Sequence, residues 1–279
     1  MVEAMASSRT VGDLLREWRH RRRVSQLDLA NQADISARHL SFLETGRSQP
    51  SREMLLHLAE QLQVPLRERN VLLNAAGFAA AFPERQLADP ALEVIRKAID
   101  VVLKGHEPYP AIAIDHHWTL VASNGAFAPL LNGASAVLLR PPVNVLRLTL
   151  HPEGLGPRLA NYHEWRTHVL EKLRCQIEIS GDPVLTGLLR ELRNYAAPAG
   201  AKAAKPSSDQ ELHRLVVPLQ VVTPGGILSF FSTTTIFGTP VDVTVSELSI
   251  ESFYPADTAT AEVLQKAAIE RQNNLPEAG

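Results

Sequence analysis

The sequence lacks most of what a secreted or membrane-bound protein carries. Its 279 residues include a single cysteine, Cys175, so no disulfide can form within the chain, and we expect a reducing cytoplasm. No apolar run approaches the roughly 18 residues of a membrane-spanning helix, so we expect no membrane association. The start, MVEAMASSRT, leads into an arginine-rich segment rather than an apolar one, which is not typical of a secretory signal.

Signatures of catalysis are missing too. The sequence contains no G-x-S-x-G elbow, Walker loop or H-E-x-x-H motif, so we expect no enzyme. A catalytic domain stays an alternative, and it would need an acid, base or nucleophile within hydrogen-bond reach of one another in a pocket. A pocket lined by Phe, Leu and Thr without such groups would count against it.

The histidines do not suggest a metal site. The candidate ligands are His116, His117, His151, His163, His168, His213 and Cys175. His163 and His168 are separated by about 140° around a helix, and adjacent His116 and His117 point to opposite faces of an extended strand. Cys175 lies in a helical stripe, where a small core residue is the ordinary interpretation. We therefore predict no metal.

Overall basicity is absent, but charge is unevenly distributed. The net charge is −2, and residues 1–85 carry +2, which leaves −4 for the remainder. The segment REWRHRRR, residues 16–23, contains five arginines around Glu17. It is either a solvated helix end or a phosphate-binding surface. The length and the 45% hydrophobic share fit a globular protein of two domains.

Helical periodicity dominates the first 77 residues and predicts five short helices. In the first, the apolar residues Val11, Leu14, Leu15 and Trp18 share one side of the helix. Another side is basic and carries Arg16, Arg19 and Arg23. The others begin at the capping residues Ser25, Ser36, Ser51 and Pro65. Between the second and third helices, small Ala30 permits a close crossing, and Asp34 stands where a positive φ is needed. This spacing is typical of a helix-turn-helix.

The remaining chain predicts an α+β domain with an antiparallel sheet. Two strands are expected in Tyr109–Asn124, helices in the middle, a mobile loop over 196–210, three strands in 212–254 and a last helix after Pro255. We place the domains at residues 1–80 (helix-turn-helix), 81–92 (connector) and 93–279 (α+β).

Aromatic side chains in this second part are candidates for a ligand pocket. In the strand ILSFFSTTTIF, Phe230 and Phe231 lie on opposite faces, each mixed with hydroxyl side chains, which suits either a pocket lining or a soluble edge strand. Trp165 and Arg158 could form an aromatic wall and an anion clamp, or could serve core packing and a surface ion pair. Trp118 could also line the pocket, or it could pack in the hydrophobic core.

The whole sequence resembles a family of bacterial regulators. SQLDLANQADISARHLSFLETGRSQPSR, continuing to PLRERNVLLNAAGF, resembles the DNA-binding domain of helix-turn-helix regulators of the xenobiotic-response-element type. YPAIAIDHHWTLVASN, LHPEGLGPRLANYHEW and FGTPVDVTVSELSIESFYPAD resemble the MmyB-type, PAS-like ligand-binding domain. The resemblance implies a transcription regulator that senses a small hydrophobic, fatty-acid-like ligand and carries no other cofactor.

The resemblance also implies particular DNA contacts. By motif position, base contacts fall to Ala37, Arg38, Ser41 and Phe42, and phosphate contacts to Gln26, Thr45 and Arg47. We expect a homodimer on double-stranded DNA with an inverted-repeat operator. In the alternative, the second domain is a ligand-free dimerisation module with a fully packed interior.

Overall fold

The computed structural model describes residues 9–199, 201 and 216–273. The chain forms two compact units. Unit 1 consists of Met1–Arg85, Glu178–Gly181 and Pro240–Ser246, and unit 2 of Gln86–Ile177, Asp182–Thr239 and Glu247–Gly279. None of the described helices combines the length and apolar character that crossing a bilayer requires. Most of the loop predicted over residues 196–210 lies outside the described residues.

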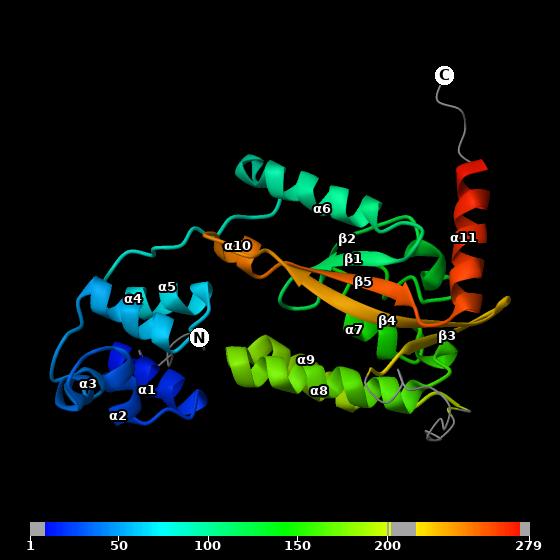
Figure 1. Ribbon diagram of the computed structural model, residues 1–279. Coiled ribbons are helices and arrows are strands. Elements are labelled where there is room, and N and C mark those ends of the chain that lie inside the picture. Colours follow the sequence, from blue (N-terminus) through cyan, green and yellow to red (C-terminus); the bar gives the residue numbers. More distant parts are fainter. Residues whose placement is uncertain (1–8, 200, 202–215, 274–279) are drawn as a thin grey trace, which may run out of the picture. The chain divides into compact units, whose positions relative to one another are not determined.

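Helices form unit 1, as predicted (Figure 1). Its main helices are α1 (Val11–Arg21), α2 (Gln26–Gln32), α3 (Ala37–Glu44), α4 (Arg52–Gln61) and α5 (Leu66–Ala75), and α10 (Val243–Ser246) joins them. The hydroxyls of Ser25, Ser36 and Ser51 each accept a hydrogen bond from the backbone N–H three residues on. These caps confirm three predicted helix starts, because they satisfy N–H groups that a first turn leaves unpaired.

The turn between α2 and α3 has the predicted helix-turn-helix form. Asp34 has a φ of 53°, so aspartate takes the left-handed conformation here. Ala30 is fully buried, and its carbonyl accepts a hydrogen bond of 2.9 Å from the N–H of Ile35. Leu40 and Leu43 on α3 are also fully buried. The two helices therefore cross closely, with the opposite side of α3 left outside the core.

The structure corrects the prediction that Arg19 belongs to a basic side of α1 directed away from the core. Arg19 is only 7% exposed, and its guanidinium donates two hydrogen bonds, of 2.6 and 2.9 Å, to the carboxylate of Glu44. The spacing of apolar residues along α1 could not reveal this, because the partner lies 25 positions away at the end of α3. Arg19 therefore stabilises the interior of unit 1 rather than contributing to a solvated face.

Unit 2 is built on a five-stranded antiparallel sheet, which confirms the predicted PAS-like α+β class. The strands are β1 (Ala111–Ile114), β2 (Leu120–Ser123), β3 (Leu219–Thr223), β4 (Gly226–Ile236) and β5 (Ser249–Pro255). They follow the order β2-β1-β5-β4-β3. Strands from both ends of the second domain's sequence therefore meet at its centre, where β1 pairs with β5.

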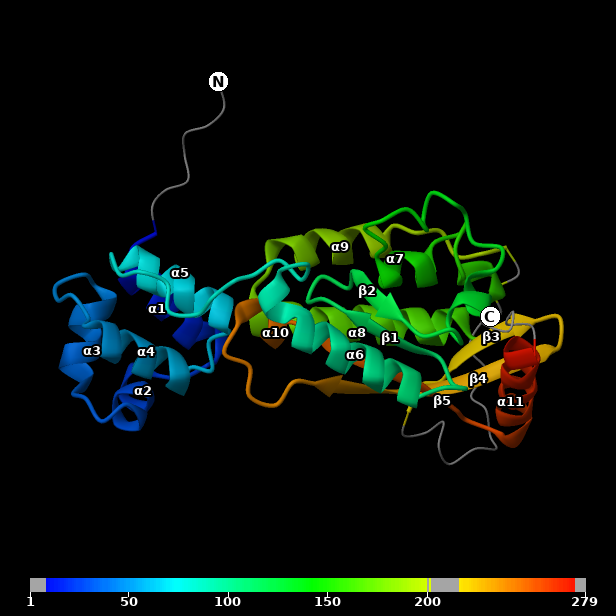
Figure 2. The ribbon, with the colours of Figure 1, turned by 90° about the horizontal axis from the view of Figure 1, so that it is seen from above.

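Helices cover the two faces of this sheet differently (Figures 1 and 2). Helix α6 (Glu93–Gly105) packs on one face, against Ala111 and Ala113 of β1. On the other face, Ile112 and Ile114 join a larger core with α7 (Val145–Leu150), α8 (Tyr162–Ser180) and α9 (Pro183–Arg193). Helix α11 (Thr258–Asn273) contacts β4 and β5. Short 3-10 helices occupy Pro90–Leu92, Ala128–Leu131 and Gly156–Arg158.

Candidate DNA-binding helix and ligand cavity

The outer face of α3 carries an aromatic ring in contact with two cations. The guanidinium carbon of Arg38 lies 5.3 Å from the ring centroid of Phe42, and that of Arg47 lies 5.9 Å from it. Both arginines are exposed, whereas Phe42 is half-buried. The cation–π contacts orient the arginines along the helix without burying their donors, so these donors stay accessible to a partner.

The other residues assigned to DNA contact lie on or beside the same helix. Ala37 and Ser41 are half-buried on α3, and Thr45 is exposed directly after it, with its hydroxyl donating to the carbonyl of Ser41 at 2.7 Å. Gln26 opens α2, and its amide donates to Glu44 Oε2 at 2.7 Å. The base and phosphate roles of these residues stay predictions.

A buried carboxylate, that of Glu44 at the end of α3, joins this helix to α1 and α2. The Glu44 side chain is fully buried and accepts hydrogen bonds from Arg19 and Gln26. Burial raises the pKa of this carboxyl group, but the bonds from Arg19 and Gln26 outweigh it, so the pKa lies below its usual value. Glu44 is therefore ionised at neutral pH and links α1, α2 and α3.

A close helix contact at Gly12 also supports α3. A Cβ atom at Gly12 would lie 2.6 Å from the carbonyl oxygen of Leu43 and 2.7 Å from that of Glu44. Only glycine allows α1 to approach the end of α3 this closely. Neither Gly12 nor Glu44 belongs to an apolar stripe, so the helical periodicity of the sequence gave no sign of their role.

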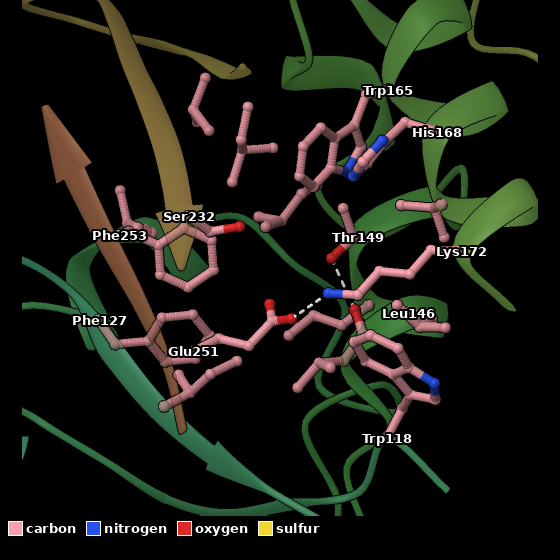
Figure 3. A pocket seen from close by; sticks show the side chains of 18 residues that line it. Trp118, Phe127, Leu146, Thr149, Trp165, His168, Lys172, Ser232, Glu251 and Phe253 are labelled. Atoms are coloured by element: carbon pink, nitrogen blue, oxygen red, sulfur yellow. Dashed lines mark hydrogen bonds and ion pairs between the residues drawn. The ribbon is translucent and has the colours of Figure 1, made fainter. Parts of the chain in front are cut away.

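A cavity lies on the α7–α9 side of the sheet in unit 2 (Figure 3). Most of its lining is apolar, including Ile112, Phe127, Leu146, Val169, Val221 and Phe253. Its volume is about 50 Å³. Pockets for drug-sized ligands span about 300–1,000 Å³, whereas one water needs about 10–15 Å³. In this conformation the cavity therefore has room for a few waters and no more.

An ion pair lies in the wall of this cavity. Lys172 on α8 and Glu251 on β5 approach to 2.5 Å between Nζ and Oε1 (Figure 3). Glu251 is only 7% exposed, and Lys172 Nζ also lies 4.8 Å from the centroid of the Trp118 ring. The pair places an acidic and a basic side chain in an otherwise mostly apolar wall, with Glu251 buried and Lys172 partly exposed.

Further polar groups line the cavity close to this pair. Burial, and after it the charge of Lys172, lowers the pKa of His168, so this imidazole is neutral at pH 7. The hydroxyl of Thr149 donates to the carbonyl of Val145. Trp165 lines the cavity, and its buried indole Nε1–H has no acceptor among the described residues. A buried donor of this kind is costly unless an acceptor is supplied.

Two of the five residues assigned to the pocket from the sequence line this cavity, namely Trp118 and Trp165. Arg158 does not, because its guanidinium donates to the carbonyls of Leu130 and Asn132. Phe230 is buried in the same core without lining the cavity.

Phe231 lies on the opposite face of β4 and stacks on Tyr254, with the ring centroids 5.3 Å apart. The neighbour that does line the cavity is Ser232.

Sequence reasoning missed Lys172 and Glu251. They are 79 residues apart, and their contact depends on how α8 packs against β5. One signal was available, because Glu251 shares its side of β5 with Phe253. A pocket without an acid and a base in contact would have counted against catalysis, and this cavity does not meet that condition.

The turn after β1 corrects the geometry assumed for two histidines. His116 and His117 lie in a turn rather than in an extended strand, and Trp118 has a φ of 66°. The two imidazole rings therefore lie on the same side, with their centroids 3.7 Å apart. The expectation that adjacent histidines diverge was wrong here, because it assumed strand alternation.

Comparisons with known proteins match each of the two parts of the chain to a domain family. Residues 10–72 match the helix-turn-helix domain family, and residues 95–267 match the MmyB-like transcription regulator ligand binding domain. A curated protein of Methanoculleus marisnigri (strain ATCC 35101 / DSM 1498 / JR1), provisionally named an HTH-type transcriptional regulatory protein, is 29% identical over 133 residues. The match covers 46% of this chain and 42% of that protein, so the chain matches under half of its relative's length.

Two solved structures also match. The clp gene regulator ClgR from C. glutamicum is 28% identical, with 26% of this chain and 94% of that chain covered and a TM-score of 0.23. An RNA-binding Light-Oxygen-Voltage receptor is 15% identical, with 97% and 65% covered and a TM-score of 0.24. At these scores neither likeness bears on the fold. The match over residues 95–267 spans more than half of the sequence. The chain therefore belongs to the family of transcription regulators with an MmyB-like ligand-binding domain, which here follows a helix-turn-helix domain.

Proposed function

We propose that this protein is a sequence-specific DNA-binding regulator whose C-terminal domain binds a small apolar molecule with an acidic head group, such as a fatty acid. The observation that carries the proposal is the cavity in unit 2, whose mostly apolar lining includes Lys172 and an indole N–H, that of Trp165, with no acceptor in the described part of the chain. Family membership supports the pairing of a DNA-binding and a ligand-binding part.

The outer face of α3 supports recognition of the major groove. An arginine can donate two hydrogen bonds to guanine, and an apolar ring can contact a thymine methyl group. Arg38 and Phe42 supply these two chemistries side by side. A homodimer on an inverted repeat would place two such helices about 34 Å apart, one turn of the duplex.

The lining of the cavity favours an amphipathic ligand over a purely apolar one. An apolar chain would contact the leucine, valine and phenylalanine side chains, while a carboxylate could accept from Lys172 and from Trp165 Nε1. Glu251 already pairs with Lys172, so an acidic head group would share the ammonium with Glu251 or displace it. The matching alcohol would lack this charge interaction and should bind more weakly.

Ligand entry requires the interior to expand. A volume of about 50 Å³ is too small for a long acyl chain, so side chains between the sheet and α7–α9 must move apart. This expansion gives the ligand a preference for one conformation, which is the condition for a ligand-driven switch. Ligand binding would then alter the affinity for DNA. The ratio of the ligand's affinities for the two conformations limits the size of this change.

Native mass spectrometry of the purified full-length protein tests the ligand, and selection from a random duplex library tests the DNA. We expect a stoichiometric acid, co-purified or taken up on titration, and an enriched inverted repeat. Uptake of the matching alcohol with equal affinity would overturn the acidic head group. A clean dimer whose melting no acid shifts would favour the dimerisation module, and failure to enrich any sequence would overturn sequence-specific binding.

A paired substitution sharpens the ligand test. Lys172→Met with Glu251→Leu removes both charges together, so neither is left buried and unpaired. We expect this variant to lose the preference for the acid over the alcohol while still taking up both. The matched control is Arg147→Met with Glu191→Leu, which removes a partly exposed ion pair, of 2.8 Å, that does not line the cavity. The control should keep the preference of the unsubstituted protein.

A further inference from the structure

We propose that His116, His117 and Asp182 form a binding site for a divalent transition-metal ion, with zinc the preferred ion, and that Glu247 orients His116 in it. The site lies outside the ligand cavity, and none of the four residues takes part in the proposed binding of DNA or ligand. One ligand atom from each of the three residues lies within 4.8 Å of the others.

The four side chains converge from three separate segments. His116 and His117 come from the turn after β1, Asp182 precedes α9, and Glu247 precedes β5. His117 Nε2 lies 2.8 Å from Asp182 Oδ2, and His116 Nδ1 lies 2.9 Å from Glu247 Oε2. Two imidazoles and a carboxylate are a typical donor set for zinc and its first-row neighbours. A carboxylate bonded to a metal-binding histidine fixes the orientation of that ring.

The backbone around the histidines is held in place by side chains. Asp115 Oδ1 accepts from the N–H groups of His117 and Thr119, each at 2.8 Å. Gln176 donates to the carbonyl of His116, and Asn144 donates to the carbonyl of His117, each at 2.8 Å. The turn is therefore fixed before any ion arrives, so little conformational entropy is lost when the rings bind one.

Asp182 is positioned by a different device. It caps α9, and its Oδ1 accepts from the N–H of Val184 at 2.7 Å and from that of Leu185 at 3.3 Å. The cap occupies one carboxylate oxygen and directs the other, Oδ2, at His117. The histidine and acid side chains are between 15% and 31% exposed, which leaves a path for an ion from solvent.

An ordinary alternative is that the two histidines merely form hydrogen bonds or ion pairs with the two acids. The geometry favours a shared ion over two separate pairs, however, because the ring centroids lie only 3.7 Å apart and one cation can bind both imidazoles. Asp182 and Glu247 each follow a segment grouped with unit 1, namely Glu178–Gly181 and Pro240–Ser246. A bound ion would therefore restrain the chain of unit 2 directly after two of its connections to unit 1.

Isothermal titration of zinc into chelator-treated full-length protein tests the site. We expect one equivalent to bind, and we expect His117→Gln and Asp182→Asn each to weaken binding by at least about tenfold. Asparagine at position 182 retains the helix cap, so folding is kept while a charged ligand is lost. Glu247→Gln should weaken binding by about 10- to 100-fold, as the loss of an orienting carboxylate does. The matched control, His163→Gln, should bind like the unsubstituted protein.

Cobalt gives a readout that does not depend on affinity alone. A tetrahedral cobalt ion in the site would show visible absorption bands, and these should vanish in His117→Gln. Far-ultraviolet circular dichroism of each metal-free variant checks that it folds. The proposal is overturned if zinc does not bind at one equivalent, or if His117→Gln and Asp182→Asn leave both zinc affinity and the cobalt spectrum unchanged. These results leave the proposed DNA and ligand functions untouched.

Discussion

The buried ion pair between Arg19 and Glu44 gives a sharp prediction for the DNA-binding unit. The side chains are 8% and 0% exposed and share two hydrogen bonds, of 2.6 and 2.9 Å. Glu44→Leu leaves the guanidinium buried without its carboxylate, which typically costs about 3–5 kcal/mol. We expect the double variant, Arg19→Met with Glu44→Leu, to recover most of this loss, because hydrophobic pairs of similar volume often replace buried ion pairs well.

Hydrogen exchange of full-length protein, followed by mass spectrometry, measures this loss in α1 and α3. A loss of about 3 kcal/mol should accelerate exchange by more than about a hundredfold in Glu44→Leu, since each 1.4 kcal/mol is a factor of ten. Amides of β1 and β5 serve as the internal control and should not change. The reasoning fails if Glu44→Leu exchanges like the unsubstituted protein, or if the double variant exchanges as fast as Glu44→Leu.

The same pair predicts an acid limit for this unit. The pKa of Glu44 lies below its usual value in the folded state, so its contribution to stability is fully present above the unfolded pKa. It is lost as pH falls through the folded pKa. We expect the exchange difference between the unsubstituted protein and the double variant to be constant near neutral pH and to change only in acid. A difference that changes within about one pH unit of neutrality would contradict this assignment.

Three further predictions concern other sites. Gly12→Ala should destabilise unit 1 by about 1–3 kcal/mol in thermal unfolding, whereas Gly187→Ala, with open space at its Cβ, should not. Arg38→Ala should weaken operator binding by about 1–3 kcal/mol and relax specificity at one base pair; uniform weakening across sequences would assign Arg38 to the backbone instead. Stability should fall as pH drops below 6.5 through the lowered pKa of His168, and His168→Gln should reduce this fall in melting curves.

Local sequence signals predicted the helices of unit 1 well. Hydroxyl caps such as Ser36 and the left-handed turn at Asp34 depend on neighbouring backbone atoms, and the structure confirms them. Arg19 was misassigned because the residue that buries it is distant in sequence. A periodic pattern identifies the side of a helix that is apolar, but it does not identify a charge whose partner lies on another helix.

The candidate site in unit 2 was harder to predict for the same reason. Aromatic residues pointed to Trp118 and Trp165, which line the cavity, but not to Lys172 and Glu251, whose contact depends on the packing of α8 against β5. The neighbouring histidines were misjudged because the argument against chelation assumed an extended backbone at a point where the chain turns. Strand alternation is reliable only where the backbone is extended, and the turn brings both rings together.

A ligand-controlled regulator requires coupling between the cavity and DNA binding. The direct measurement is fluorescence anisotropy of the selected operator duplex, titrated with ligand-free and ligand-loaded protein at one fixed salt concentration. We expect the operator Kd to differ by at least about fivefold, and the ligand Kd to change by the same factor when operator is bound. Equal operator affinity for the two forms, with the ligand shown to be bound throughout, would contradict the account.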